Sequence, residues 1–274
     1  MPDKRIRYGV YLPPFGPFGD PAVLVELAVR AEAAGWDGVF LWDHVVTEAM
    51  PIVDCWSTLA AIATATERVL LGPMVTPLAR RRPWIVARQA ATVSRLSAGR
   101  LVFGAGLGSD ESGDFSRFGD PVDPGVRAEL LDEGLAVAEA MWAGRAYRSA
   151  RIDIAETEPN PYPIPVWLAS TTGRPQVLRR AARHDGIFPN PESHTPGPEE
   201  VADLVAAVRA AGLPADRPFD VAVPGNASQA WPEQPRIDLA GLAEAGMTWW
   251  MESLIHFDPL DLSLRIVDAG PPRA

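Results

Sequence analysis

The 274-residue sequence predicts an α/β protein, a single (β/α)8 TIM barrel in one domain that spans residues 1–274. Eight short apolar runs alternate with eight stretches of helical periodicity along the chain, which is the pattern of βα units around a parallel sheet. The length suits one closed barrel, and neither a linker nor a change of composition divides the chain. An open doubly wound sheet is the alternative, but eight regular units favour closure.

Each predicted strand is a short run of apolar and β-branched residues, and each predicted helix carries an apolar stripe. The first helix has the clearest boundaries, because Asp20-Pro21 supplies an N-cap with a following proline and Gly35 ends it. The proline-rich stretch 147–165 is expected to form a loop or a short β excursion. Strands are expected at residues 5–12, 38–42, 69–76, 101–103, 166–169, 186–188, 219–223 and 248–251. Helices are expected at residues 21–34, 56–65, 83–96, 126–142, 174–183, 199–211, 237–245 and 260–269.

The composition restricts the class of protein. A formal net charge of −10 at pH 7 argues against a general surface for nucleic acid or anionic membranes. The sequence has no apolar run of roughly 18 to 20 residues and no signal-peptide pattern at its N-terminus. Cys55 is the only cysteine, which excludes an intramolecular disulfide and favours a core or loop residue over a nucleophile. We therefore expect a cytoplasmic protein whose partner is a small molecule.

The pair Asp43-His44 follows the predicted strand 38–42, where the chain leaves the interior. In a barrel of this type, catalytic and ligand-binding groups lie at the carboxyl ends of the strands. A carboxylate and an imidazole at this point therefore indicate a functional site. Taken alone, the dipeptide also fits a strand-end turn in which both side chains only cap the backbone.

Glycines 104, 106 and 108 follow the predicted strand 101–103. Bare backbone amides at such a turn can hold a phosphate, and glycine also permits a tight turn or the approach of a flat ring. A dinucleotide-binding fingerprint would require a further glycine where this chain has Ser109, which weakens that interpretation. The other interpretations stay open.

Two polar segments follow other predicted strands. Ser170-Thr171-Thr172-Gly173 precedes a helix, where its hydroxyl and amide groups would either cap the helix or bind an anion. Arg80-Arg81-Arg82 follows the third strand, where it is either a solvated face or an attractor for an anionic ligand tail. Both pairs of alternatives remain open from the residues alone.

Several other classes of site are poorly supported. The four histidines, at positions 44, 184, 194 and 256, show no metal-ligand spacing, so we expect no metal. The sequence has no G-x-S-x-G elbow. Trp231, Trp249 and Trp250 are expected in the core or at an interface.

A series of short motifs runs along the chain, and together they resemble those of the luciferase-like monooxygenase superfamily. Each motif is loose, but their order and spacing are specific and cover most of residues 5–190. The motifs are RAEAAGWD at 30–37, LWDH at 41–44, LGPMVTP at 71–77, RP and RQ within 82–89, RLSAGR at 95–100, the glycines at 104–108, FSRFG at 115–119, DEGL and MW within 132–142, and PVWL at 165–168.

The resemblance implies that the barrel binds FMN or the deazaflavin F420, and Trp42-Asp43-His44 is most similar to the F420-dependent branch. In that branch the histidine would transfer a proton, and the aspartate would orient the ring or tune the histidine. The resemblance also implies a non-prolyl cis peptide at Met74-Val75, behind the ring. The implied cofactor-binding residues are Asp43, His44, Met74, Val75, Thr76, Gly106, Leu107, Gly108, Ala169, Ser170, Thr171, Thr172 and Gly173.

Two features depart from that pattern. Ser109 stands where the F420-dependent sugar-phosphate dehydrogenases carry a glutamate, which weakens an assignment to sugar or alcohol oxidation by the same acid/base pair. Lys4 is the only lysine, so arginines would have to meet an F420 tail, or the cofactor would be FMN.

The leading hypothesis is an F420-dependent oxidoreductase that transfers a hydride between the deazaflavin and a small organic substrate. His44 and Asp43 would be its catalytic residues. One alternative is a reduced-FMN-dependent monooxygenase of the same superfamily, and another is a non-catalytic flavin-binding barrel. The resemblance also implies a homodimer.

Overall fold

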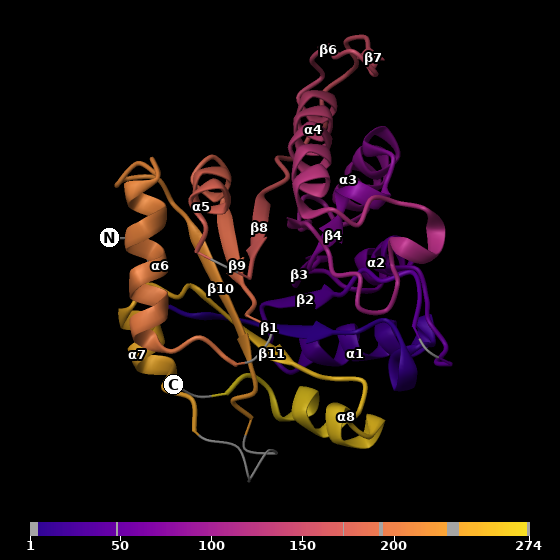
Figure 1. Cartoon of the computed structure of the whole chain (residues 1–274). Helices are drawn as coiled ribbons and strands as arrows, with labels where there is room; N and C mark the ends of the chain where they lie inside the picture. Colours follow the sequence, from indigo (N-terminus) through magenta and orange to yellow (C-terminus); the bar gives the residue numbers. More distant parts are fainter. Residues whose placement is uncertain (1–4, 48, 172, 192–193, 229–235, 273–274) are drawn as a thin grey trace.

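The computed structural model describes residues 5–47, 49–171, 173–191, 194–228 and 236–272. Strands and helices alternate through this part of the chain, and the strands form the wall of a barrel (Figure 1). Successive strands lie side by side in the wall and pair in parallel. The prediction of a (β/α)8 barrel is confirmed.

One nine-stranded parallel sheet forms the wall, in the order β3-β2-β1-β11-β10-β9-β8-β5-β4. The strand β1 pairs with both β2 and β11, so the first and last barrel strands of the chain are neighbours. The bounds are β1 Arg7–Leu12, β2 Gly38–Leu41, β3 Leu70–Pro73, β4 Thr76–Pro77, β5 Phe103–Gly106, β8 Val166–Ser170, β9 Gly186–Pro189, β10 Asp220–Gly225 and β11 Trp249–Ser253.

The third position of the barrel is one strand in two pieces. β3 pairs with β2, whereas β4, which follows Met74 and Val75, pairs with β5. A parallel bridge between Leu71 and Leu101 connects β3 to the segment that precedes β5. With β3 and β4 counted as one position, the wall has the eight positions that the sequence predicts.

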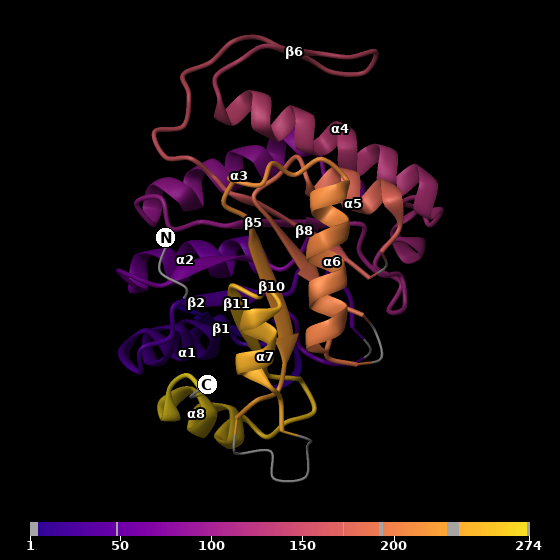
Figure 2. The same ribbon diagram turned by 90° about the vertical axis from the view of Figure 1, so that its left-hand side faces the viewer.

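Helices cover the outside of the barrel (Figures 1 and 2). Side chains of Asp20, Asp54, Asp123 and Asp238 cap the N-termini of α1, α2, α4 and α7. Among the described helices, none is both long and apolar enough to cross a membrane. The bounds are α1 Pro21–Ala33, α2 Cys55–Ala65, α3 Pro83–Leu96, α4 Pro124–Trp142, α5 Pro175–Ala181, α6 Pro198–Ala210, α7 Leu239–Glu244 and α8 Leu260–Ala269, with 3-10 turns η1 Gly16–Phe18, η2 Leu78–Arg80 and η3 Ser116–Phe118.

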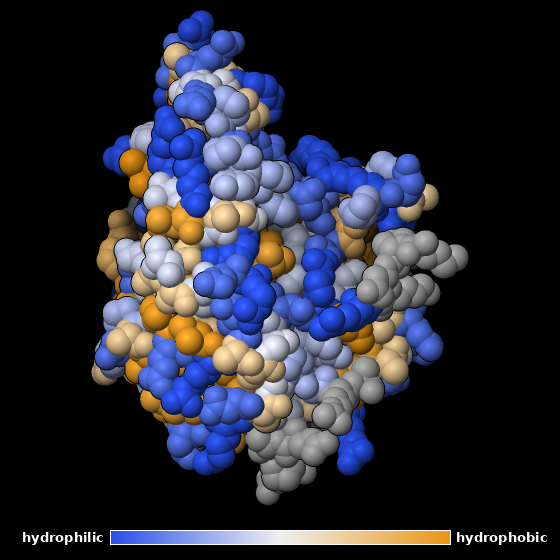
Figure 3. All heavy atoms as spheres, turned by 180° about the vertical axis from the view of Figure 1, so that it is seen from behind, coloured by the Kyte–Doolittle hydropathy of each residue, from blue (hydrophilic) through white to orange (hydrophobic). Residues whose placement is uncertain are grey.

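The stretch 147–165 contains a short antiparallel pair, so the β excursion is the alternative that the structure adopts. β6 (Tyr147–Arg148) pairs with β7 (Asp153–Ile154) just after α4, and the pair projects beyond the barrel (Figure 1). The tip of this projection is predominantly hydrophilic (Figure 3), and the ion pair between Arg148 and Asp153 is exposed.

Two apolar layers hold the barrel together. A large cluster lies between the sheet and the helices, and a smaller one fills the interior of the barrel. In the interior, Phe40, Trp167 and Trp249 contact one another with ring centroids 5.5 to 5.8 Å apart. Trp249, Trp250 and Cys55 are fully buried, as predicted, whereas Trp231 lies outside the described residues. The interior cluster comprises Tyr11, Phe40, Met74, Val102, Trp167, Phe188, Ala222, Trp249 and Met251.

Closure between β3 and β5 requires a residue without a side chain at Gly72. A Cβ atom there would lie 1.9 Å from the carbonyl oxygen of Val102, which is backbone and has little freedom to move. We expect Gly72→Ala to lower the free energy of unfolding by about 3 kcal/mol or more, measured by urea denaturation. Gly173→Ala is the control, because its Cβ would meet nothing within 4 Å. An equal loss in both variants would contradict the role given to Gly72.

Candidate active site

The carboxyl ends of the strands meet at one end of the barrel, and Asp43 and His44 lie there, just after β2. The top of the interior cluster forms an apolar floor at this end, made by the partly buried side chains of Trp42, Val75 and Ala169. Gly106 lies between two of them, because a Cβ on it would be 2.6 Å from Val75 Cγ2 and 3.1 Å from Ala169 Cβ. Three of the residues predicted to bind the cofactor are thus brought together from β5, β8 and the break in the third strand.

Gly104 and Gly108, which follow the fourth predicted strand, are needed for different structural reasons. A Cβ on Gly104 would lie 2.2 Å from the carbonyl oxygen of Pro73, so this glycine serves the contact between neighbouring strands. Gly108 has a φ of +74°, which favours glycine, and it begins the connection to α4. Leu107 between them is partly exposed at the rim.

The peptide bond between Met74 and Val75 is cis, as the resemblance implied. Met74 is buried in the interior cluster and Val75 is partly exposed at its top. Thr76 follows at the start of β4 and is fully buried. Its hydroxyl accepts a hydrogen bond from the indole N–H of Trp56 at 3.1 Å and donates one to Asp43 at 2.8 Å.

Asp43 is held on several sides by groups from the third strand and the turn after it. Its side chain is 1% exposed, and its Oδ1 atom lies 2.5 Å from Arg81 Nη2 and 3.4 Å from Arg80 Nη2. Arg80 also donates a hydrogen bond to the backbone carbonyl of Asp43. The Arg80 side chain is 3% exposed and that of Arg81 is 15% exposed. The solvated-face alternative is therefore wrong for these two arginines, and Arg82 alone is exposed.

His44 pairs with a carboxylate that the sequence interpretation missed. Its Nδ1 atom lies 2.6 Å from Asp114 Oδ2, and the backbone N–H of Val45 donates to Asp114 Oδ1 at 2.8 Å. Burial raises the pKa of Asp114, but the hydrogen bonds from His44 and Val45 and the charges of His44 and Arg80 outweigh it and hold the pKa below its ordinary value. Asp114 is thus ionised at neutral pH and only accepts, so the proton lies on His44 Nδ1.

This geometry changes the role expected for Asp43. The carboxylate bonded to the imidazole is Asp114, and both oxygens of Asp43 accept hydrogen bonds from Thr76 and Arg81. In the neutral form of His44, Nε2 is therefore the unprotonated acceptor. The only sequence signal for Asp114 was its place in the glycine- and aspartate-rich connection between β5 and α4.

Aromatic rings surround His44. Its ring centroid lies 5.7 Å from that of Phe15 and 6.0 Å from that of Trp42. The ring centroid of Phe15 also lies 4.9 Å from that of His256, which belongs to the loop after β11. Burial lowers the pKa of His256, and the charge of His44 lowers it further against the opposing effect of Asp258. A second imidazole, whose neutral form is favoured, therefore lies at the same end of the barrel.

The segment predicted to hold a phosphate begins at the end of β8. Ser170 is buried at the end of β8, while Thr171 and Gly173 are exposed, and Thr172 lies outside the described residues. The N-cap of α5 is Arg174, which makes no capping hydrogen bond through its side chain. None of the described residues among 170–173 therefore occupies the N-cap position of α5.

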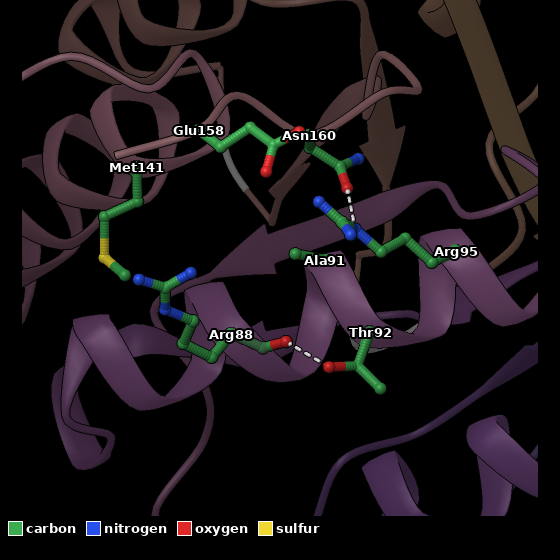
Figure 4. A pocket seen from close by; sticks show the side chains of 7 residues that line it. All are labelled: Arg88, Ala91, Thr92, Arg95, Met141, Glu158 and Asn160. Carbon is green, nitrogen blue, oxygen red and sulfur yellow. Dashed lines mark hydrogen bonds between the residues drawn. The ribbon is translucent and has the colours of Figure 1, made fainter. Parts of the chain in front are cut away.

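Two cavities lie outside the barrel mouth. One, of about 240 Å³, is lined by residues of α3, by Met141 and by Glu158 and Asn160 (Figure 4), and none of these belongs to a strand end. The other, of about 250 Å³, is lined by Arg80, Arg81 and the start of α3, behind Asp43. The described residues contain no cluster of three or more His, Cys, Asp or Glu side chains that fits a metal ion.

Comparison with protein families identifies the chain's relatives. The model of the luciferase-like monooxygenase family matches residues 6–252. The chain belongs to this family. Members of the luciferase-like family with curated descriptions are similar over a shorter stretch than the family model.

Two such relatives are F420-dependent glucose-6-phosphate dehydrogenases. The protein from Beutenbergia cavernae is 36% identical over 180 residues, which are 60% of this chain and 50% of the relative. The protein from Intrasporangium calvum is 34% identical over 186 residues, 61% of this chain and 53% of the relative. The matches thus span about half the length of these relatives.

Solved structures support the fold over nearly the whole chain. An F420-dependent secondary alcohol dehydrogenase in complex with an F420-acetone adduct superposes with a TM-score of 0.76, at 15% identity, and the match covers 96% of this chain and 97% of the other. The coenzyme F420-dependent tetrahydromethanopterin reductase from Methanopyrus kandleri gives a TM-score of 0.72 at 17% identity, with 97% and 98% covered. A monooxygenase from Streptomyces bottropensis gives 0.71 at 19% identity, with 96% of each chain covered.

Asp114 should stabilise the fold in a pH-dependent way. Because its pKa is lower in the folded than in the unfolded chain, its contribution is complete above the unfolded value of about 4 and is lost as pH falls through the folded value. We expect Asp114→Asn to lower the free energy of unfolding by about 1.5–3 kcal/mol at pH 7, with a difference that shrinks below pH 4. Urea denaturation at pH 7 and at pH 3 measures both values.

Asp261→Asn is the control for that measurement, since Asp261 forms only an exposed ion pair with Arg265 on α8. Its effect should stay within about 0.5 kcal/mol. A constant difference between Asp114→Asn and the native chain from pH 7 to pH 3 would contradict the depressed pKa.

Proposed function

We propose that the protein is an F420-dependent oxidoreductase that transfers a hydride between the deazaflavin and a small organic substrate. The observation that carries the proposal is the His44–Asp114 pair beside the apolar floor of the barrel mouth. The similarity to F420-dependent glucose-6-phosphate dehydrogenases supports the choice of cofactor.

The residues present at the barrel mouth fit a flat ring. Trp42, Val75 and Ala169 are partly exposed and apolar, and Gly106 leaves the space between two of them without a side chain of its own. The indole N–H of Trp42 is buried and has no partner among the described residues, so it is free to donate to a ring substituent. F420, when bound, accepts or supplies the hydride.

His44 would handle the proton that accompanies the hydride. Asp114 fixes the proton on Nδ1, which leaves Nε2 to accept a proton from a substrate or, after protonation, to return it. Asp114 also stabilises the imidazolium that forms, as a buried carboxylate does for a catalytic histidine. Asp43 would act through position, because it joins the end of β2 to the turn after β4.

A reduced-FMN-dependent monooxygenase is the second candidate. The family description itself favours it, and a monooxygenase is among the solved structures with the same fold. A non-catalytic flavin-binding barrel would keep the floor but would have no use for the His44–Asp114 pair.

Titration with the two cofactors separates these candidates. We expect the purified protein to bind F420, measured by the change in deazaflavin fluorescence, at least about tenfold more tightly than FMN, a difference of about 1.4 kcal/mol. Both rings would lie on the same apolar floor, so a difference in affinity would come from the parts in which the two cofactors differ. Tighter binding of FMN, together with oxygen uptake in the presence of reduced FMN, would overturn the F420 assignment.

Replacement of His44 tests catalysis separately from binding. With a substrate found by screening alcohols and carbonyl compounds against oxidised and reduced F420, His44→Gln should lower kcat by about 10²- to 10⁴-fold. Its affinity for F420 should change little, because glutamine keeps a polar group of similar reach. His194→Gln is the matched control, since His194 is exposed in the segment before α6, where it pairs with Glu200. Equal turnover in His44→Gln and the native chain would refute the proton-transfer role.

A further inference from the structure

The cavity of about 250 Å³ behind Asp43 is not used by the proposed reaction. Its lining comes from the turn after β4 and from one face of α3, where the contributing positions are three or four residues apart. It opens beside the N-terminus of α3, at the same end of the barrel as His44. The lining residues are Arg80, Arg81, Arg82, Ile85, Val86 and Gln89.

Several buried hydrogen-bond donors of this lining have no partner in the part of the chain that the structure describes. Arg80, with a side chain 3% exposed, leaves Nε and Nη1 unpaired, because its contacts with Asp43 use only Nη2. Arg81 likewise leaves Nε unpaired. The side-chain oxygen of Gln89 is also buried without a partner, and a flip of this amide would present its NH2 group instead. A buried guanidinium nitrogen without an acceptor is costly, so an acceptor that binds in the cavity would relieve this cost.

The N-terminus of α3 also favours an anion in this cavity. Its N-cap residue, Arg82, makes no capping hydrogen bond through its side chain, and the first turn contains no acidic residue. The first backbone N–H groups of a helix and the positive end of its dipole both favour an anion. Asp43 is the carboxylate that hydrogen-bonds Arg80 and Arg81, and Arg82 brings a third positive charge.

We propose that this cavity is a binding site for a small oxyanion, a phosphate or a carboxylate group, held by Arg80, Arg81 and Arg82 at the start of α3. Planar guanidinium groups bind such oxyanions through paired hydrogen bonds. The chain as a whole carries a net charge of −10, so a general attraction for anions does not account for the cluster. The inference does not depend on the proposed function.

Binding of an oxyanion in this cavity would affect the barrel mouth through Asp43. The same two guanidinium groups that line the cavity hold the Asp43 carboxylate and backbone, and His44 is the next residue. The oxyanion has two sources that share this chemistry: a free phosphate-class metabolite, or an anionic group at the end of a cofactor tail. The experiment below distinguishes them.

Thermal unfolding of the full chain in increasing inorganic phosphate tests the site, with sodium chloride at matched ionic strength as reference. We expect phosphate, and not chloride, to raise Tm along a saturating curve. Arg82→Gln and Gln89→Leu should each weaken the apparent phosphate affinity by about fivefold or more. Neither residue contacts Asp43, so both variants should fold.

Arg88→Gln is the matched control, because Arg88 lies on the same helix and loses the same charge but lines the other cavity (Figure 4). It should keep the native response to phosphate. Loss of F420 affinity in saturating phosphate would assign the site to the cofactor's anionic end, and unchanged F420 affinity would assign it to a free anion. Equal stabilisation by phosphate and chloride, or an equal effect of Arg88→Gln and Arg82→Gln, would overturn the proposal.

Discussion

The burial of one carboxylate, Asp43, is the constraint on which the barrel mouth depends. A carboxyl side chain that is 1% exposed requires paired charges and full hydrogen bonding. Arg81 and Arg80 supply the charges, and Thr76 supplies a hydroxyl from the far side of the break in the third strand. The end of β2, the start of β4 and the turn before α3 are consequently fixed relative to one another.

The broken third strand places this carboxylate's partners. Since β3 pairs with β2 and β4 pairs with β5, residues 74 and 75 carry the chain from one neighbour to the other. The crossing is close enough that Gly72 and Gly104 meet backbone atoms of the adjacent strands. Val75 then lies near Ala169 in the apolar floor. The break in the third strand therefore contributes both to the closure of the barrel and to the candidate site.

The strands and helices could be predicted from the sequence because local features mark them: apolar periodicity, an aspartate N-cap or a proline. The break at Met74-Val75 came from the family resemblance, since nothing in those two side chains requires it. The partner of His44 could not be predicted from the sequence. Asp114 is 70 residues away in the chain, in an irregular connection, and only the closed barrel brings it within 2.6 Å. The choice between the two alternatives for the arginines could not be made from the sequence for a related reason. A run of three charges is typical of a solvated face, whereas burial of Arg80 and Arg81 depends on Asp43, 37 and 38 residues earlier.

The charged groups at the barrel mouth also act on one another. Asp43 and Asp114 carry two negative charges, Arg80 and Arg81 carry two positive charges, and Arg80 acts electrostatically on both carboxylates. A proton taken up at His44 Nε2 would add a positive charge to this set. Beside the apolar floor, such a charge is strongly felt by any group placed above it. The charge of a group held at the barrel mouth would therefore be coupled to the protonation of His44.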